Sequence, residues 1–212
     1  MNFSLKKLLS MSAAQLIYLN QHPDKDIVNI TPLILEGQKY QQTILNKLNE
    51  SAYYIDEMGC VYRTSQGSNI YFSHDIVKNN GKEIFETKYN NSLALENDYL
   101  MKSALQCAVY DTLTRFSSPL LHKSKFAQNG FNNATIELDP YYQYFLSIGN
   151  SLFKITLLNP YPILEFIENK TAIVEKGDYN EARYFDSIWK GNEYKILREC
   201  FRITEIAHQY LI

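Results

Sequence analysis

The sequence predicts a single domain of the α/β (α+β) class, and three observations lead to this prediction. The 212 residues are 45% hydrophobic and 21% charged, which is ordinary for a soluble globular protein with one well-buried core. Helical and strand-like periodicities follow one another in the order helix, helix, strands, helix, strands, helices. Two Asn/Gly pairs divide the strand-like segments into hairpins. We expect the core of this single domain (1–212) to span about 31–160, with a C-terminal helical elaboration over about 161–212.

The N-terminal part of the chain is predicted to hold two helices and a strand. Apolar residues recur at helical spacing over 4–21, and Pro23 is expected to end this helix. A second helix is predicted over 33–50, because Pro32 is suited to a first helical turn. Residues 52–64 predict a strand or a hairpin.

The second half of the chain is predicted to add one long helix and a hairpin. The helix is expected over about 96–115 and is followed by polar, irregular sequence over 117–133. The segments YQYFLSIG and LFKITLLN, divided by Gly149-Asn150, predict the hairpin. The remaining predicted elements are all C-terminal: a short strand near 162–167 and helices near 179–190 and 193–211.

The most informative segment is a predicted hairpin. Its strands, 69–78 and 82–89, meet at Asn80-Gly81, and Asn-Gly is the strongest short signal for a type I′ hairpin turn. This turn places Asp75 directly opposite Glu86, with Cβ atoms about 5 Å apart. Two carboxylates at that distance repel unless a cation lies between them. The hairpin therefore predicts a divalent metal site.

Alternation along the two strands predicts which side chains share this site. One face is predicted to hold Ser73, Asp75, Val77, Ile84, Glu86 and Lys88, and the other His74, Ile76, Phe85 and Thr87. Lys88 therefore adds a positive charge beside the two carboxylates. The alternative is the solvated face of an exposed hairpin. The apolar neighbours of Asp75 favour a central strand, where unpaired charges are costly.

A Glu-x-Lys triplet by itself is a weak signal, because the chain contains it three times. The three copies are Glu86/Lys88, Glu168/Lys170 and Glu193/Lys195. The second copy is expected at a strand end, and the third at the start of a helix, where residues two apart point in different directions. Only the first copy lies within a predicted strand and opposite an aspartate.

Asp75, followed on the next strand by Glu86-Thr87-Lys88, resembles the core motif of the PD-(D/E)XK nuclease superfamily. His74 stands where this motif often has proline. The resemblance covers roughly residues 31–115. It implies a restriction-endonuclease-like fold, in which a central mixed sheet is flanked by helices.

The same resemblance implies metal-assisted hydrolysis of a phosphodiester. Asp75, Glu86 and the backbone carbonyl of Thr87 would hold Mg²⁺ or Mn²⁺, which are hard ions that prefer oxygen ligands. The ion would polarise the phosphate and lower the pKa of a water molecule. Lys88 would orient that water and stabilise the developing charge. Asp75, Glu86 and Lys88 are thus the predicted catalytic residues.

The helix after the hairpin adds to the resemblance. Gln106 and Tyr110 match the QxxxY motif of the RecB-like exonuclease branch, and residues four apart share one helix face. Tyr99 and Ser103 extend this polar stripe. The resemblance implies that these four side chains bind the substrate.

Two further features of the RecB-like branch are matched poorly. That branch usually places a histidine or acidic metal ligand four residues after a helix glycine, and here Gln41 follows Gly37, with Glu36 as the other candidate ligand. Glutamine is a poor metal ligand beside His or Glu. Some members also carry a four-cysteine iron–sulfur cluster. The three scattered cysteines predict that this protein has no such cluster.

The implied function is a Mg²⁺- or Mn²⁺-dependent deoxyribonuclease. The QxxxY motif favours exonuclease or end-processing activity, in repair, recombination or mobile-element biology. Two alternatives stay open. One is a structure-specific or restriction-type endonuclease on the same fold, and the other is a catalytically weak nuclease-like fold that binds nucleic acid or assists assembly. The resemblance does not distinguish single-stranded from double-stranded DNA, or DNA from RNA.

Composition limits the partners and the compartment. A net charge of −2 and a pI near 6.1 exclude a passive, charge-driven coat on nucleic acid, but they allow a local basic groove. The odd, dispersed cysteines fit a reducing compartment, and no apolar run approaches the length of a membrane span. We therefore predict a cytoplasmic protein without membrane association. C-terminal aromatic residues such as Trp189 are expected to pack on the core, with a homo-oligomer contact or a protein partner as alternatives.

Overall fold

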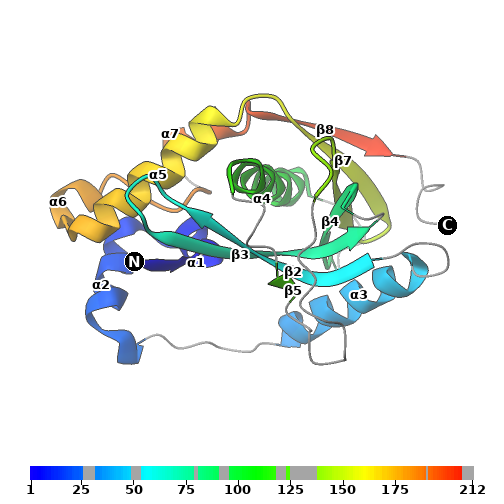
Figure 1. Ribbon diagram of the computed structural model, residues 1–212, viewed down its shortest axis with the longest axis horizontal. Helices are drawn as coiled ribbons and strands as arrows, with labels where there is room; N and C mark the ends of the chain where they lie inside the picture. The colour runs from blue at the N-terminus through cyan, green and yellow to red at the C-terminus, as the bar shows by residue number, and fades with distance from the viewer. Residues whose placement is uncertain are drawn as a thin grey trace.

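The protein has a mixed α/β architecture, in which helices cover both faces of one sheet (Figure 1). Helix α4 (Asn97–Phe116) lies across one face, and helix α3 (Pro32–Leu48) lies against the other. The expected fold class is therefore confirmed at this level. The computed structural model describes residues 1–25, 32–48, 54–78, 81–90, 96–117, 123–124, 138–189 and 191–206.

The described residues form an eight-stranded mixed sheet in the order β5-β2-β3-β4-β6-β7-β8, with β1 paired to β3. The strands are β1 (Asn2–Ser4), β2 (Tyr54–Arg63), β3 (Asn69–Lys78), β4 (Glu83–Lys88), β5 (Lys123–Ser124), β6 (Gln143–Ile148), β7 (Ser151–Leu157) and β8 (Phe201–Ile206). The β1–β3 and β4–β6 pairs are parallel, and the other pairs are antiparallel.

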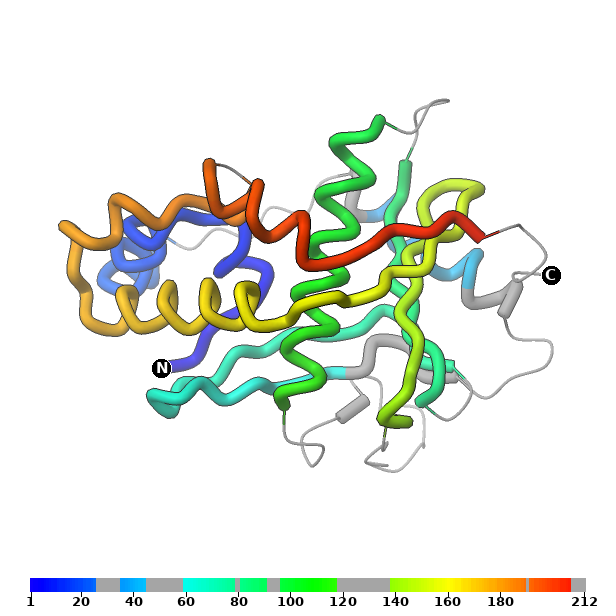
Figure 2. The backbone as a smooth tube through the Cα atoms, turned by 90° about the horizontal axis from the view of Figure 1, so that it is seen from above, coloured from blue at the N-terminus to red at the C-terminus, as the bar shows by residue number. Residues whose placement is uncertain are grey.

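The remaining helices belong to the N-terminal and C-terminal parts of the sequence. They are α1 (Leu5–Ser10), α2 (Ala13–Gln21), α5 (Tyr161–Lys176), α6 (Tyr179–Ala182) and α7 (Gly191–Leu197), with one 3₁₀ turn, η1 (Pro23–Lys25). Seen from above, α1 and α2 lie beside α5 and α6 at one end of the molecule (Figure 2). The first and last parts of the chain therefore build one common structure.

The hairpin of β3 and β4 has the predicted register. Val77 lies opposite Ile84, and Ile76 lies opposite Phe85. Gly81 has a φ of 87°, a left-handed conformation that glycine adopts readily. Asn80, the other expected turn residue, is outside the described residues. The predicted hairpin of β6 and β7 and the predicted helices α3 and α4 are also confirmed. Of the segment expected to be a strand or a hairpin, the described part forms the single strand β2 (Tyr54–Arg63).

The N-terminal helix expected over 4–21 is two helices. The chain breaks at Ser12, whose hydroxyl accepts a hydrogen bond from the backbone N–H of Gln15, while the Gln15 side chain accepts one from the backbone N–H of Ser12. This capping box begins α2, and the helix predicted over 4–21 is therefore interrupted at Ser12. Strand β1 was not predicted, because three residues are too few to distinguish a strand pattern from the helical pattern that follows.

The strand expected near 162–167 is wrong, because these residues lie in helix α5. Ile163, Ile167 and Val174 are buried at helical spacing, and Pro162 stands in the first turn, where proline is tolerated. Glu168 is therefore on a helix and not at a strand end. Its carboxylate accepts hydrogen bonds from the Tyr62 hydroxyl and from Ser65.

The two helices expected near 179–190 and 193–211 are also wrong in extent. Helix α6 has four residues and α7 ends at Leu197, after which Phe201–Ile206 forms β8. The sequence FRITEI alternates apolar and polar residues at its start, which is a strand pattern. Its pairing with β7 makes the C-terminal elaboration part of the sheet.

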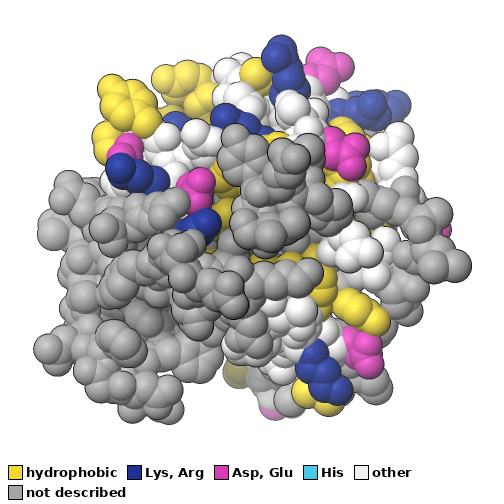
Figure 3. Space-filling model, turned by 90° about the vertical axis from the view of Figure 1, so that its right-hand side faces the viewer, with side chains coloured by type: hydrophobic (Ala, Val, Ile, Leu, Met, Phe, Trp, Pro, Cys, Tyr) yellow, Lys and Arg dark blue, Asp and Glu magenta, His cyan; other side chains and the backbone are white. Residues whose placement is uncertain are grey.

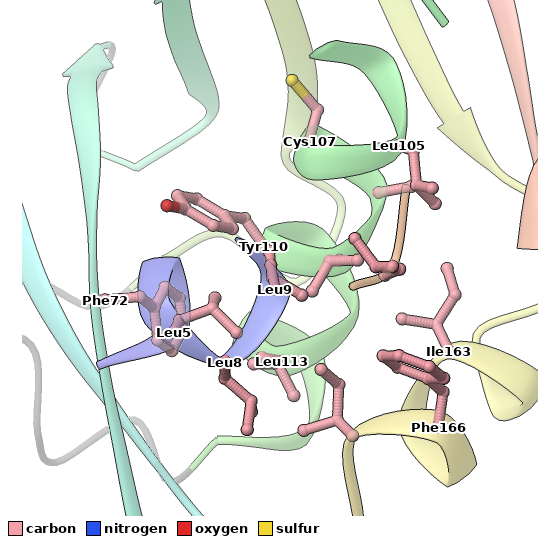
Figure 4. Packing of buried hydrophobic residues seen from close by; sticks show 14 of the residues in the cluster. Leu5, Leu8, Leu9, Phe72, Leu105, Cys107, Tyr110, Leu113, Ile163 and Phe166 are labelled. Carbon is pink, nitrogen blue, oxygen red and sulfur yellow. The ribbon is translucent and has the colours of Figure 1, made fainter. Parts of the chain in front are cut away.

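The larger hydrophobic cluster lies on the α4 side of the sheet, where side chains from α1, β3, α4 and α5 meet (Figure 4). Helix α4 is buried over most of its circumference, so it fixes the position of any polar side chain it carries. A smaller cluster on the α3 side contains Ile44, Ile76, Phe85, Phe145 and Leu152. The β3–β4 hairpin is therefore covered on both faces, as the central-strand interpretation requires.

Lys170 of α5 is a fully buried cation that joins the two ends of the chain. Its ammonium donates hydrogen bonds to the carbonyl oxygens of Met11 (2.6 Å) and Asp186 (2.9 Å). Burial lowers the pKa of Lys170 to about 8, although the charge of Asp186 acts in the opposite direction.

This lowered pKa predicts a pH dependence of stability. Between about pH 8 and 10.5, Lys170 has lost its proton in the folded protein but keeps it in the unfolded chain, so stability rises with pH over this window. Wild type is expected to gain on the order of 3 kcal/mol relative to Lys170→Met across the window. Urea unfolding at several pH values measures the difference. Lys176→Met, on the exposed surface of the same helix, should follow wild type, and parallel wild-type and Lys170→Met curves would contradict the assignment.

Candidate metal-dependent active site

The candidate site lies where β3 and β4 separate. Strands β1 and β4 pair with opposite ends of β3, at residues 69–71 and 76–78, and Asp75 stands at the edge of this gap. The backbone N–H and the hydroxyl of Thr87 both donate to Oδ2 of Asp75, each at 2.8 Å. The Asp75 carboxylate thus takes the place of a backbone acceptor. The β3–β4 ladder ends at the Ile76–Phe85 pair, so the expected Asp75–Glu86 pair is not part of it. The charge of Asp75 still acts on the Glu86 carboxyl.

Glu86 is the most constrained side chain of the site, with 3% of its surface exposed. Its Oε1 accepts hydrogen bonds from Lys88 Nζ (2.6 Å) and Gln106 Nε2 (3.0 Å). Its Oε2 is buried and accepts no hydrogen bond from any described residue. Such an oxygen is rare in native proteins, and an ion or a water is the usual explanation. Burial, and then the charge of Asp75, raise the pKa of Glu86 to about 7.

Lys88 supplies the positive charge of the site. Burial lowers its pKa, but the carboxylates of Glu86 and Asp75 outweigh burial and hold the pKa above the ordinary lysine value. The side chain is 23% exposed, so its ammonium is both paired with Glu86 and accessible from outside. Lys88 therefore stays a cation at neutral pH and is unsuited to act as a general base.

Helix α4 brings the QxxxY pair to this carboxylate. Gln106 contacts Glu86 directly, and the Tyr110 hydroxyl is hydrogen-bonded to Gln106. Tyr110 is buried and projects from α4 towards β3 and α1 (Figure 4). Burial raises its pKa, so the hydroxyl stays protonated. This geometry gives Tyr110 a role in orienting Gln106, and direct contact between Tyr110 and a substrate stays a prediction.

Helix α3 reaches the site from the other face of the sheet. The amide nitrogen of Gln41 lies 3.4 Å from the backbone oxygen of Asp75, so this side chain faces the site with a donor group. Glu36, the other candidate ligand, is hydrogen-bonded to the hydroxyl of Tyr89. Tyr40 fixes the helix by bonding to Ser147 and to the carbonyl of Gly149. Metal ligation by Gln41 or Glu36 stays a prediction.

The predicted alternation of side chains is wrong at His74. Its ring is hydrogen-bonded to Tyr144 (3.1 Å) and to Thr114 of α4 (2.9 Å), whereas Ile76 lies in the α3-side cluster. His74 and Ile76 were expected on the same face of the sheet but lie on opposite faces. The alternation of side chains is therefore interrupted at Asp75, which lies between them. His74 is a buried structural residue at this position.

The donor set fits a hard divalent ion of the Mg²⁺ type. Asp75 and Glu86 offer two carboxylates, one with a buried oxygen that lacks a partner, and Mg²⁺ is commonly held by one or two carboxylates together with water and substrate phosphates. Within the described ranges, no group of three His, Cys, Asp or Glu side chains is arranged to hold a metal.

Two hollows are lined by residues that neighbour the site. One, of about 640 Å³, is lined by Lys88, Tyr99, Ser103 and Gln106, together with Trp189, and is called the Trp189 cavity below. The other, of about 780 Å³, is lined by Tyr110 with Lys6, Tyr71 and Ser73 among others. Of the four predicted substrate-binding residues, Tyr99, Ser103 and Gln106 thus line the Trp189 cavity, and Tyr110 lines the other hollow.

The sequence prediction missed the residues that the two ends of the chain contribute. The Trp189 cavity is lined by Ser10 and Gln15 from the N-terminal part of the chain and by Asp186, Ser187 and Trp189 from the C-terminal part. Lys6 is close enough to act on the pKa of Glu86. No spacing pattern marks these residues, because they meet only through the contact between α1–α2 and α5.

Comparisons with models of known protein families, with curated proteins and with solved structures return no significant match.

Lysine, arginine and acidic side chains are interspersed over the described part of the face in Figure 3. Among the described residues, no helix is both long enough and apolar enough to cross a membrane. Function is therefore inferred from the side chains of the site.

Proposed function

We propose that the protein is a Mg²⁺- or Mn²⁺-dependent nuclease that hydrolyses DNA phosphodiester bonds, built on a restriction-endonuclease-like core. The observation that supports this most strongly is the buried, unpaired Oε2 of Glu86 beside Asp75. The lysine and glutamine that hold the other Glu86 oxygen are those of the Glu-x-Lys and QxxxY motifs. Exonuclease or end-processing activity is the favoured form.

Each residue of the site has its own role in the proposed reaction. A divalent ion on Asp75 and Glu86 supplies polarisation of the phosphate and activation of water when it is bound. Lys88, which remains charged, stabilises negative charge that develops on the phosphate. Gln106 and Thr87 hold the carboxylates of Glu86 and Asp75 in place through the hydrogen bonds given above.

The test of this proposal is a cleavage assay on linear and covalently closed DNA, with Mg²⁺, Mn²⁺ or EDTA. Metal-dependent loss of linear DNA alone supports an exonuclease, and cleavage of both supports an endonuclease. If pure, folded protein cuts neither, yet still binds DNA or a protein partner, the nuclease-like binding or assembly role replaces the proposal.

A milder defect is expected when Gln106 is replaced by alanine. The substitution removes the donor at 3.0 Å from Glu86 but leaves Lys88 in place, so the carboxylate is oriented less well. We expect cleavage to fall by about 10- to 100-fold, the usual effect of removing a group that positions a metal ligand. Steady-state kinetics measure this change. Gln143→Ala, on the exposed surface of β6, should behave as wild type.

A further inference from the structure

The Trp189 cavity lies directly beside the proposed reaction centre, and three parts of the chain enclose it. Lys88 and Gln106 belong to the centre itself, Tyr99 and Lys102 come from the first turns of α4, and Trp189 comes from the C-terminal segment. The N-terminal helices add Ser10 and Gln15. A molecule bound in this cavity can therefore reach Lys88.

The outer wall of the cavity is held together by buried hydrogen bonds. The N–H of Ala13 donates to the carbonyl of Phe185 (2.8 Å), and the N–H of Ile188 donates to that of Leu9 (3.0 Å). Lys170 adds its two bonds to Met11 and Asp186. Figures 1 and 2 both place these N-terminal helices beside α5. The wall is therefore a preformed surface.

The chemistry of the lining suits a nucleoside next to a phosphate. Trp189 is partly buried against the main cluster, and Tyr99 is held by a bond from its hydroxyl to the carbonyl of Tyr89. The two aromatic rings offer stacking surfaces for a base. Lys88 and Lys102 add positive charge for a phosphate, although Lys88 is paired with Glu86 and Lys102 with Asp98. Asp186 is an acidic residue of the same lining. A hollow of about 640 Å³ has the size of a small-molecule site and offers room for one nucleoside.

We propose that the Trp189 cavity is a subsite for the unpaired nucleotide next to the scissile phosphate, so that the protein acts on single-stranded ends of nucleic acid. This inference rests on the proposed function. The base lies against Trp189 and Tyr99, and its phosphate lies near Lys88. Duplex ends must then be opened before they can be cut.

Binding can be measured separately from cleavage, because Trp189 is the single tryptophan of the chain. The protein is titrated in Ca²⁺ with a hexathymidylate single strand, and in parallel with a blunt DNA hairpin at equal phosphate concentration. We expect saturable quenching of tryptophan fluorescence by the single strand and little by the hairpin. Absence of quenching, or equal quenching by both, would overturn the subsite.

Variants give a second readout through the anisotropy of a labelled hexathymidylate. Trp189→Ala is expected to weaken binding by about 5- to 100-fold, the range for loss of one stacked base, and Trp189→Phe to retain most of it. Tyr141→Ala removes an aromatic ring that is 89% exposed and lies outside this cavity, so it should bind as wild type. Unchanged binding by Trp189→Ala would also overturn the subsite.

The two proposals fail in different ways. Quenching by the single strand without any metal-dependent cleavage leaves the subsite and removes the nuclease. Metal-dependent cleavage without quenching leaves the nuclease and removes the subsite.

Discussion

Replacing Lys88 by alanine is expected to lower cleavage of DNA by about 100- to 1,000-fold, the effect of removing one preorganised group that stabilises transition-state charge. Lys88 is the cation that contacts Glu86 at 2.6 Å and is partly accessible from outside. Single-turnover cleavage of labelled DNA in Mn²⁺ measures the rate. Circular dichroism shows whether the variant has folded.

The matched control is Lys82→Ala, because Lys82 lies on the same hairpin but is exposed. This variant should cut at the wild-type rate. A Lys88→Ala protein that folds and cleaves as fast as wild type would remove Lys88 from the mechanism and, with it, the reading of Glu86-Thr87-Lys88 as a catalytic motif.

The second large effect is expected on the response of stability to metal. A ligand present at 100 times its dissociation constant stabilises the folded state by about 2.7 kcal/mol, which raises the melting temperature of a protein of this length by about 5–10 °C. Glu86→Gln should abolish this rise with Mg²⁺ or Mn²⁺, because it removes the charge of the buried carboxylate. Thermal melts with and without metal measure the shift.

Glu83→Gln is the control for this experiment. Glu83 lies on the same strand and pairs with Lys78 outside the site, so its removal should leave the metal response intact. If Glu86→Gln is stabilised by Mn²⁺ as much as wild type, the ion binds elsewhere.

Local sequence patterns predicted the centre of the fold and of the candidate site. The Asn-Gly turn was sufficient to place Val77 opposite Ile84 and Ile76 opposite Phe85. The four-residue spacing on α4 singled out Gln106, which donates a hydrogen bond to Glu86. These contacts join residues that are within about thirty positions of one another, so local sequence patterns are sufficient to predict them.

Features that depend on distant partners were not predicted. The alternating segment FRITEI becomes a strand because β7 offers an edge about fifty residues earlier in the chain. Lys170, placed at a strand end by its local context, is instead a buried link between Met11 and Asp186. The wall of the Trp189 cavity could not be predicted either, because residues far apart in the chain form it.

His74 shows a different limit. The prediction assumed that residues two apart in a strand lie on the same face of the sheet. His74 and Ile76 lie on opposite faces, and the change occurs at Asp75, where the strands β3 and β4 separate. The irregularity lies at the candidate site itself. Functional sites are where departures from regular patterns are expected.

The claim on which the others depend is that a divalent ion binds between Asp75 and Glu86. Anomalous diffraction from a crystal of the protein soaked in Mn²⁺ tests it most directly. We predict one strong anomalous peak bonded to Oε2 of Glu86 and to the carboxylate of Asp75, and no such peak in a Glu86→Gln crystal. A wild-type crystal with no peak there, or with manganese bound only to other side chains, would contradict the account.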